Sequence, residues 1–171
     1  MRINYSNQEV LKNEKSIFLA GPTPRREDVK TWRIEACDIL EKLGFDGIVY
    51  VPEYSANIPL ESYDNQVEWE RDALSNASVI VFWVPRDLKD MPAFTTNVEF
   101  GYWIHSGKIL YGIPDDSEKN KYLDWLYQKD TGMKPFNNLE ELLVSSVDLA
   151  NRTGINKHTE ILPLQQRKIM Y

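Results

Sequence analysis

The sequence predicts a single α/β domain, a flavodoxin-like or Rossmann-like parallel sheet with helices on both faces. Four apolar runs of strand length recur along the chain, and segments with helical spacing of apolar residues separate them. Proline follows three of the four runs and ends each strand, because proline cannot donate a hydrogen bond to a sheet. The strands are expected near 16–20, 47–51, 79–84 and 108–113.

The third run, Val79–Val84, is apolar throughout, which is typical of a central strand covered on both faces. A polar loop follows, and Thr95-Thr96-Asn97 offers N-cap side chains for a helix that starts near Val98. Glu99 is then expected in the first turn of this helix, just beyond the carboxyl end of the strand, where open α/β sheets bind ligands. The helix dipole would favour its ionised form there. An ordinary, solvated first-turn glutamate is the alternative interpretation.

The remaining elements follow from the spacing of apolar residues. Helices are expected at about 28–43, 65–76, 98–106, 118–129 and 139–150. The chain divides into an N-terminal arm at 1–15, the α/β domain at 16–155 and a C-terminal tail at 156–171. The glycine-rich dinucleotide fingerprint and the Walker pattern are both absent from the sequence, and no cofactor is expected.

Composition narrows the function. The net charge of -6 and the pI near 5.0 argue against a nucleic-acid polymer as partner, because such binders usually carry a basic excess. The single cysteine, Cys37, excludes an intramolecular disulfide. No apolar run approaches the roughly 18 residues of a membrane span, and Met1 to Lys15 lacks a signal-peptide segment, so a cytoplasmic protein without a membrane partner is expected. His105 and His158 are too few and too separated for a zinc site, so no metal is expected.

Four loops should meet at the carboxyl edge of the sheet: 21–27, 52–64, 85–97 and 114–117. In the first, Thr23 and Arg25 can hold a phosphate or a carboxylate, although Arg25 and Arg26 can equally be a solvated pair. The helix before the central strand carries Glu70 and Asp72, which point about 200° apart on a helix. Only one of them can therefore share a site with Glu99, and Glu70 is the preferred partner.

Two or three carboxylates without a metal cluster favour glycosidic-bond chemistry. Retaining enzymes cleave a bond at an anomeric carbon with a carboxylate nucleophile and a second acidic group. Trp32, Trp69 and Trp83 can stack a nucleobase, although packing in the core is the commoner use of each ring.

Five segments stand in a recognisable order: Ile17–Pro22, Trp32-Arg33, Trp69-Glu70 with Leu74, Val79–Pro85, and Asn97–Tyr102. Together they resemble the nucleoside 2-deoxyribosyltransferase family, in its 2-deoxyribosyltransferase-like branch. The resemblance covers about residues 16–114. It implies a flavodoxin-like fold, a small-molecule nucleoside or nucleotide as substrate, and a homo-oligomer whose sites border a neighbouring subunit.

The resemblance also implies roles for individual residues. Glu99 would attack C1′ of a deoxyribonucleoside, and Glu70, where transferases more usually show Asp, would position or protonate the base. Substrate contacts would fall on Gly21, Pro22, Thr23, Arg25, Trp69, Pro85, Asp87, Asp90 and Asn97. The chain ends in Tyr171, and transferases often end in a tyrosine whose terminal carboxylate reaches the base.

The expected activity is cleavage or transfer of an N-glycosidic bond through a sugar ester on Glu99. A hydrolase-only enzyme of the same fold is one alternative, and a noncatalytic nucleotide-binding sensor is another. A sensor has no need of a nucleophile at position 99, and its ligand would survive incubation with the protein. The sequence does not select the base, the sugar or the acceptor.

Overall fold

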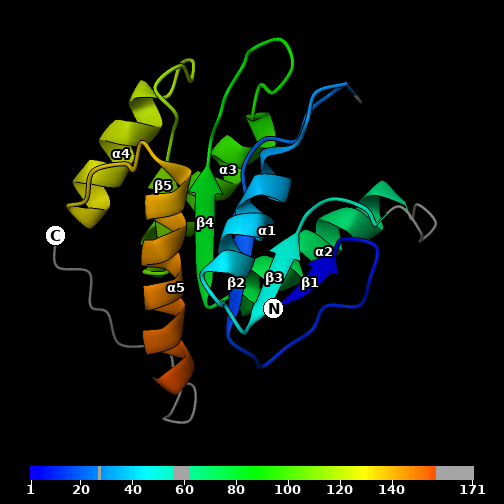
Figure 1. Ribbon diagram of the computed structural model, residues 1–171. Helices are drawn as coiled ribbons and strands as arrows, with labels where there is room; N and C mark the ends of the chain where they lie inside the picture. The colour runs from blue at the N-terminus through cyan, green and yellow to red at the C-terminus, as the bar shows by residue number, and fades with distance from the viewer. Residues whose placement is uncertain (27, 56–61, 157–171) are drawn as a thin grey trace, which may run out of the picture.

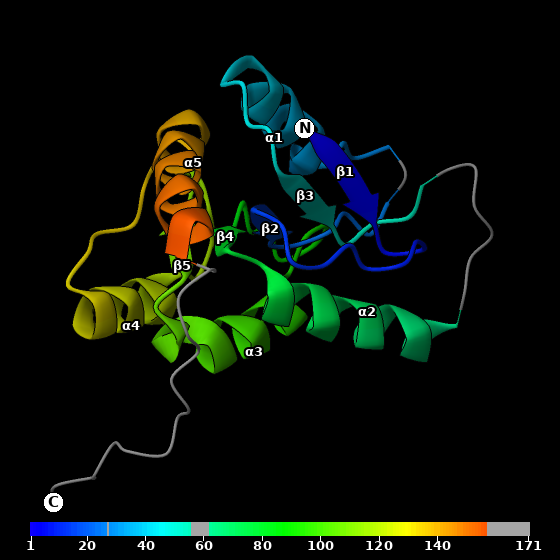
Figure 2. The ribbon, with the colours of Figure 1, turned by 90° about the horizontal axis from the view of Figure 1, so that it is seen from below.

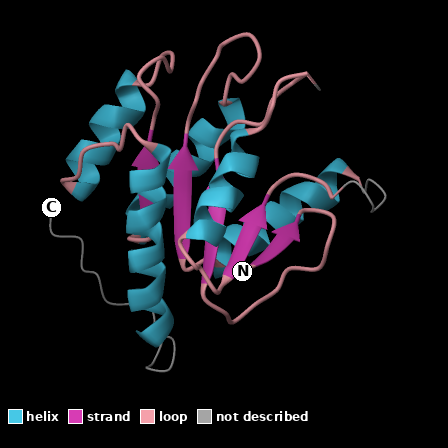
Figure 3. Ribbon diagram, viewed as in Figure 1, coloured by secondary structure: helices cyan, strands magenta, loops and turns pink. Residues whose placement is uncertain are grey.

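The computed structural model describes residues 1–26, 28–55 and 62–156 of the 171-residue chain (Figure 1). Within these residues one sheet contains β1 (Arg2–Tyr5), β2 (Ser16–Ala20), β3 (Ile48–Val51), β4 (Val79–Trp83) and β5 (Ile109–Gly112). The strand order is β1-β3-β2-β4-β5 and every pairing is parallel, so the arrows in Figure 3 point to the same edge. The predicted α/β fold with a parallel sheet is confirmed.

Helices cover both faces of the sheet (Figure 2). They are α1 (Trp32–Lys42), α2 (Tyr63–Asn76), α3 (Phe94–Trp103) with the short 3-10 turn η1 (Ile104–Ser106), α4 (Lys121–Thr131) and α5 (Leu139–Asn156). Helices α1 and α5 pack on one face, and α2, α3 and α4 on the other. None of the helices in the described ranges is long and apolar enough to cross a membrane.

Alternation along β2 shows how the sequence builds the two cores. Ile17 and Leu19 point to the face covered by α1 and α5, whereas Phe18 and Ala20 point to the face covered by α2 and α3. All the residues of β2, β3, β4 and β5 are buried, as the unbroken apolar runs predict. Counted from β2, the order of these strands is 2-1-3-4, as in flavodoxin-like sheets.

Two details differ from the sequence-based expectations. Residues 2–5, assigned to an arm, form the edge strand β1 on β3. Helix α1 begins at Trp32, after the N-cap Thr31, and not at Asp28. Asn156, the first residue of the predicted C-terminal tail at 156–171, ends α5. The rest of that tail, including Tyr171, lies outside the described residues.

The start of α3 differs from the predicted start, and this boundary decides where Glu99 lies on the helix. The helix begins at Phe94 and not near Val98, and its N-cap is Ala93, which adopts a left-handed conformation with φ of 58°. No side chain caps this helix, so the predicted N-cap role of Thr95-Thr96-Asn97 is wrong. Glu99 consequently lies in the second turn of α3, where the field of the helix terminus has faded.

Candidate active site

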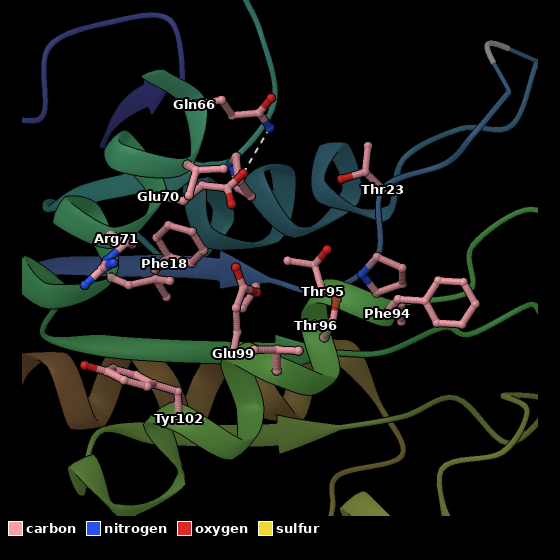
Figure 4. Close-up of a pocket in the computed structure, with 18 of the residues that line it drawn as sticks. Phe18, Thr23, Gln66, Glu70, Arg71, Phe94, Thr95, Thr96, Glu99 and Tyr102 are labelled. Carbon is pink, nitrogen blue, oxygen red and sulfur yellow. Dashed lines mark hydrogen bonds between the residues drawn. The ribbon is translucent and has the colours of Figure 1, made fainter. Parts of the chain in front are cut away.

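A cavity of about 580 Å³ lies between α2 and α3, on the sheet face that Phe18 and Ala20 share (Figure 4). Its walls come from β2 and the following loop, from α2 between Tyr63 and Ser75, and from residues 92–103. Arg33 of α1 also reaches it. This volume is typical of sites for small molecules, which range over about 300–1,000 Å³.

Two carboxyl groups project into the cavity from its facing walls. Glu70 comes from the middle of α2 and Glu99 from α3, and Figure 4 shows the two side chains turned toward one another. Burial raises the pKa of Glu99, and the neighbouring charge of Glu70 raises it further, to about 7. Burial also raises the pKa of Glu70, whereas a hydrogen bond from Gln66 lowers it. The expectation that a helix dipole keeps Glu99 ionised is therefore wrong, because desolvation dominates.

The positive charge behind these carboxylates belongs to Arg33, whose side chain is almost wholly buried. Its attraction lowers the pKa of both Glu70 and Glu99, against the effect of burial. The guanidinium donates to Leu19 O at 3.0 Å, Gly21 O at 2.7 Å, Thr23 Oγ1 at 3.1 Å and Glu53 Oε1 at 2.7 Å. Arg33 thus holds the loop after β2 in place and balances the acidic pair.

That loop makes the end of the cavity nearest the carboxyl edge of the sheet. A Cβ added to Gly21, which has φ of 151°, would lie 2.1 Å from Trp83 O, so only glycine permits this close approach to β4. Trp32 Nε1 donates to Pro22 O at 3.1 Å. Arg25 lies with its guanidinium 5.6 Å from the ring centre of Phe94, and both residues line the cavity.

A comparison with known protein families gives a match over the segments that form this cavity. The family described as nucleoside 2-deoxyribosyltransferase like matches residues 14–117, well over half of the chain. The chain belongs to the nucleoside 2-deoxyribosyltransferase-like family. The matched region includes Glu70, Glu99, Arg33 and the whole loop after β2. Among curated proteins, none matches the chain closely enough to count as a relative.

Membership in the nucleoside 2-deoxyribosyltransferase-like family supports a nucleoside-processing enzyme with a small nucleoside-related ligand. Six of the site residues predicted from the sequence line the cavity: Gly21, Pro22, Thr23, Arg25, Glu70 and Glu99. They come from three separate segments that together span residues 21–99, and the fold brings these segments to one cavity.

The other predicted substrate residues do not line the cavity. Trp69 is buried in the core against Phe18 and Tyr50, with ring centres 6.2 Å from each. Asp87 accepts hydrogen bonds from the backbone of Lys89 and Asp90, and so shapes the turn after β4.

Asp90 lies near this turn with its carboxylate 3.9 Å from Arg26. Asn97 accepts a hydrogen bond from the buried guanidinium of Arg86. Pro85 lies between β4 and Arg86, away from the cavity lining.

Several cavity residues received no site role from the sequence, although two of them, Arg33 and Tyr102, lie in segments that carry the family resemblance. They are Arg33, Gln66, Arg71, Phe94 and Tyr102. A signal for Arg33 was present, since it shares the buried face of α1 with Ala36 and Leu40 at helical spacing. An arginine on an apolar face needs a buried acceptor, and Glu53 at the end of β3 supplies one. Over the described ranges, no cluster of three or more His, Cys, Asp or Glu side chains could hold a metal.

Proposed function

We propose that the protein cleaves the N-glycosidic bond of a nucleoside or deoxynucleoside, or of its 5′-monophosphate, and passes the sugar to another base or to water. The observation that carries this proposal is the meeting of Glu70 and Glu99 in one cavity, in a chain of the nucleoside 2-deoxyribosyltransferase-like family. A second acidic group beside a carboxylate nucleophile is the arrangement of retaining glycosyl-transfer chemistry.

In the first step a carboxylate oxygen of Glu99 attacks C1′ of the sugar. A C1′–O ester bond forms as the C1′–N bond breaks, and the bonding pair leaves with the base nitrogen. Glu70 donates a proton to the departing base, and the developing positive charge of the sugar is attracted to the acidic pair.

In the second step water or the nitrogen of an acceptor base attacks C1′ from the side that the first base left. The C1′–O bond breaks and its electron pair returns to Glu99. The proton of the water or of the acceptor N–H goes to Glu70, which restores the starting enzyme. Hydrolysis and transfer thus differ only in the acceptor.

The first step needs Glu99 ionised and Glu70 protonated, and the second step needs Glu70 ionised so that it can accept a proton. Burial and, to a smaller extent, the charge of Glu70 raise the pKa of Glu99 to about 7, so the interacting pair still holds a proton near neutral pH. Arg33 opposes the accumulation of protons on the pair. The singly protonated pair is therefore accessible at neutral pH.

The 5′ end of the substrate is proposed to lie against the loop after β2. Arg25 lines this end of the cavity, and guanidinium groups form strong, directed hydrogen bonds to phosphate. The adjacent Arg26 is not part of the lining and instead pairs with Asp28. A 5′-monophosphate is accordingly the preferred form of the substrate.

Exposed apolar side chains at the edge of the same cavity support a homo-oligomer as part of this proposal. Phe94, Val98 and Tyr102 recur every four residues along α3 and expose 67%, 73% and 73% of their surface. An apolar stripe of this kind is typical of an interaction surface. Because these side chains also line the cavity, a second subunit packed on them would border the site.

The decisive experiment is incubation with a panel of deoxynucleosides, ribonucleosides and their 5′-monophosphates, with and without a free acceptor base. Chromatography separates free base, free sugar and exchanged nucleoside. Exchange supports a transferase, and release of base that an acceptor does not redirect supports the hydrolase-only alternative. A ligand that binds the wild type and stays intact would refute the proposed activity in favour of the sensor. The Glu99→Gln variant serves as the matched control throughout.

A further inference from the structure

A chain of two hydrogen bonds ends on the carboxyl group of Glu70. The Tyr54 hydroxyl donates to Gln66 Oε1 at 2.6 Å, and Gln66 Nε2 donates to Glu70 Oε1 at 3.0 Å. Gln66 and Glu70 are four residues apart on α2, so their side chains are neighbours on one face of the helix. Tyr54 comes from the segment after β3, and the Gln66–Glu70 bond is the dashed line in Figure 4.

The direction of these bonds follows from the chemistry of the groups. An ionised carboxylate only accepts hydrogen bonds, so the amide of Gln66 must turn its NH2 group toward Glu70. Its carbonyl oxygen then faces away and needs a donor, which is the hydroxyl of Tyr54. The carboxylate of Glu70 therefore selects the orientation of the amide, and the Tyr54 hydroxyl supplies the donor that this orientation requires.

We propose that Tyr54 and Gln66 are positioning residues that keep Oε1 of Glu70 as an acceptor and so direct the acidic proton to Oε2. Figure 4 shows Glu70 between Gln66 and Glu99, so Oε2 is the oxygen that remains for a ligand in the cavity. The inference rests on the proposed function for its catalytic meaning, in which this proton passes to the base.

The charged groups that line the cavity in the described part of the chain do not distinguish Oε1 from Oε2 of Glu70 by a hydrogen bond or ion pair. Arg33 faces Glu70 from α1 and favours the ionised carboxylate, and Glu99 faces it from α3 with a like charge. Arg25 and Arg71 complete the charged residues of the lining, and no hydrogen bond or ion pair joins either side chain to Glu70 among the described residues. These charges change how readily Glu70 ionises, whereas Gln66 is the side chain within the described part of the chain that donates a hydrogen bond to one of its two oxygens.

The test is a pH titration of Glu70 by NMR in protein carrying 13C at the glutamate side-chain carboxyls, with Glu70→Gln to assign the signal. Gln66→Leu removes a hydrogen bond to the charged form, so the pKa of Glu70 should rise by roughly 0.5–1 unit. Tyr54→Phe frees the amide to rotate and should raise the pKa by less. Tyr122→Phe, an exposed tyrosine on α4, is the matched control and should leave the titration unchanged.

The double variant of Tyr54→Phe and Gln66→Leu shows whether the two residues act on Glu70 through one hydrogen-bond chain or independently. Once Gln66 is leucine, Tyr54→Phe should cause no further shift, because the hydroxyl acts only through the amide. An equal shift from Tyr54→Phe in both backgrounds would overturn the role of Tyr54. An unchanged Glu70 titration in a folded Gln66→Leu protein would overturn the inference as a whole.

Turnover distinguishes this inference from the proposed function. If the wild type processes a nucleoside, the alkaline limb of its kcat/KM profile should move upward in Gln66→Leu by the shift that NMR measures. If no substrate in the panel reacts while the NMR shift is present, the proposed function fails and the hydrogen-bond selection at Glu70 stands. If turnover occurs and its alkaline limb stays fixed in Gln66→Leu, the catalytic part of the inference is overturned.

Discussion

The guanidinium of Arg33 and the carboxylate of Glu53 form a buried ion pair, with Nη1 and Oε1 2.7 Å apart. Only 2% of the Arg33 side chain and 20% of the Glu53 side chain are exposed. Thr31, the N-cap of α1, donates to the same Glu53 oxygen at 2.6 Å. The pair thus joins the start of α1 to the end of β3 and, through Arg33, to the loop after β2 that lines the cavity.

We expect Arg33→Met to lower the free energy of unfolding by about 3–5 kcal/mol, because it leaves a largely buried carboxylate without its partner. It also removes the donors to Leu19 O, Gly21 O and Thr23 Oγ1. Urea unfolding followed by circular dichroism measures the change.

The matched control is the exposed pair between Arg26 and Asp28. Arg26→Ala removes the ion pair with Asp28, in which the side chains are 49% and 65% exposed, and should leave the urea midpoint almost unchanged. In a double-mutant cycle, Glu53→Gln should restore part of the stability lost in Arg33→Met. Equal midpoints for Arg33→Met and Arg26→Ala would show that the buried pair does not support the site.

The sheet could be predicted from the sequence because its strands β2 to β5 are buried on both faces. Burial on both faces requires unbroken apolar runs, and such runs are visible without any tertiary information. The edge strand β1 was not found, because only Ile3 and Tyr5 carry apolar bodies toward the core and Arg2 and Asn4 interrupt them. The start of α3 was missed because Ala93 begins it through backbone geometry, whereas Thr95 and Thr96 resemble caps.

The acidic pair of the candidate site could also be anticipated. The angle between residues on a helix separates Glu70 from Asp72, and Asp72 indeed pairs with Lys12, outside the cavity. The partners of the residues that tune the pair could not be anticipated. Arg33 and Gln66 act through partners on other segments, Glu53 and Tyr54, and no local pattern indicates which partner each side chain meets.

We expect Arg25→Ala to raise the KM for a nucleoside 5′-monophosphate by about 10- to 100-fold, the loss that follows from one or two charge-assisted hydrogen bonds. The KM for the matching nucleoside should change much less, because it lacks the phosphate. Steady-state kinetics with both substrates measures the difference. Arg26→Ala is the neighbouring control, since Arg26 does not line the cavity. Equal effects of Arg25→Ala on both substrates would contradict phosphate recognition.

We expect Val98→Asp to reduce the molar mass in solution, because it places a charge in the exposed apolar stripe of α3. Light scattering coupled to size exclusion measures the mass. Val144→Asp on α5 is the matched control, since Val144 is exposed on the opposite face of the sheet and should leave the assembly unchanged. A monomeric wild type, or an oligomer that survives Val98→Asp, would refute assembly through this stripe.

We expect Glu99→Gln to lower turnover by several orders of magnitude while the protein still folds and binds substrate, because an amide cannot form the ester. A slow 2′-fluoro substrate should leave a sugar adduct on the wild type, visible by intact mass. Peptide mapping should locate the adduct on Glu99. Turnover near the wild-type rate in Glu99→Gln, or an adduct on Glu70, would exclude the proposed mechanism.

We expect the stability of the wild type relative to Glu99→Gln to fall as the pH rises from about 4.5 to 7. The pKa of Glu99 is raised from 4.5 to about 7 in the folded protein, so between these values the folded state binds more protons than the unfolded state. The slope of the unfolding free energy with pH equals 2.303RT times the protons bound by the unfolded minus the folded state, and it is negative in this window. Below this pH window, the contribution of Glu99 to the free energy of unfolding is constant. Above it, the wild type bears the full cost of the ionised Glu99 in the cavity.

The size of this effect follows from the shift, at about 1.4 kcal/mol for each pH unit. Glu99→Gln stays neutral at every pH, so at pH 8 it should gain on the order of 3–4 kcal/mol over the wild type relative to pH 4. Urea unfolding at a series of pH values measures the difference. In a Glu70→Gln background the pH range over which the stability difference changes should become narrower but should not vanish. Burial is the larger cause of the raised pKa of Glu99, and the charge of Glu70 is the smaller. A difference between wild type and Glu99→Gln that stays constant with pH would mean that Glu99 ionises freely in the cavity.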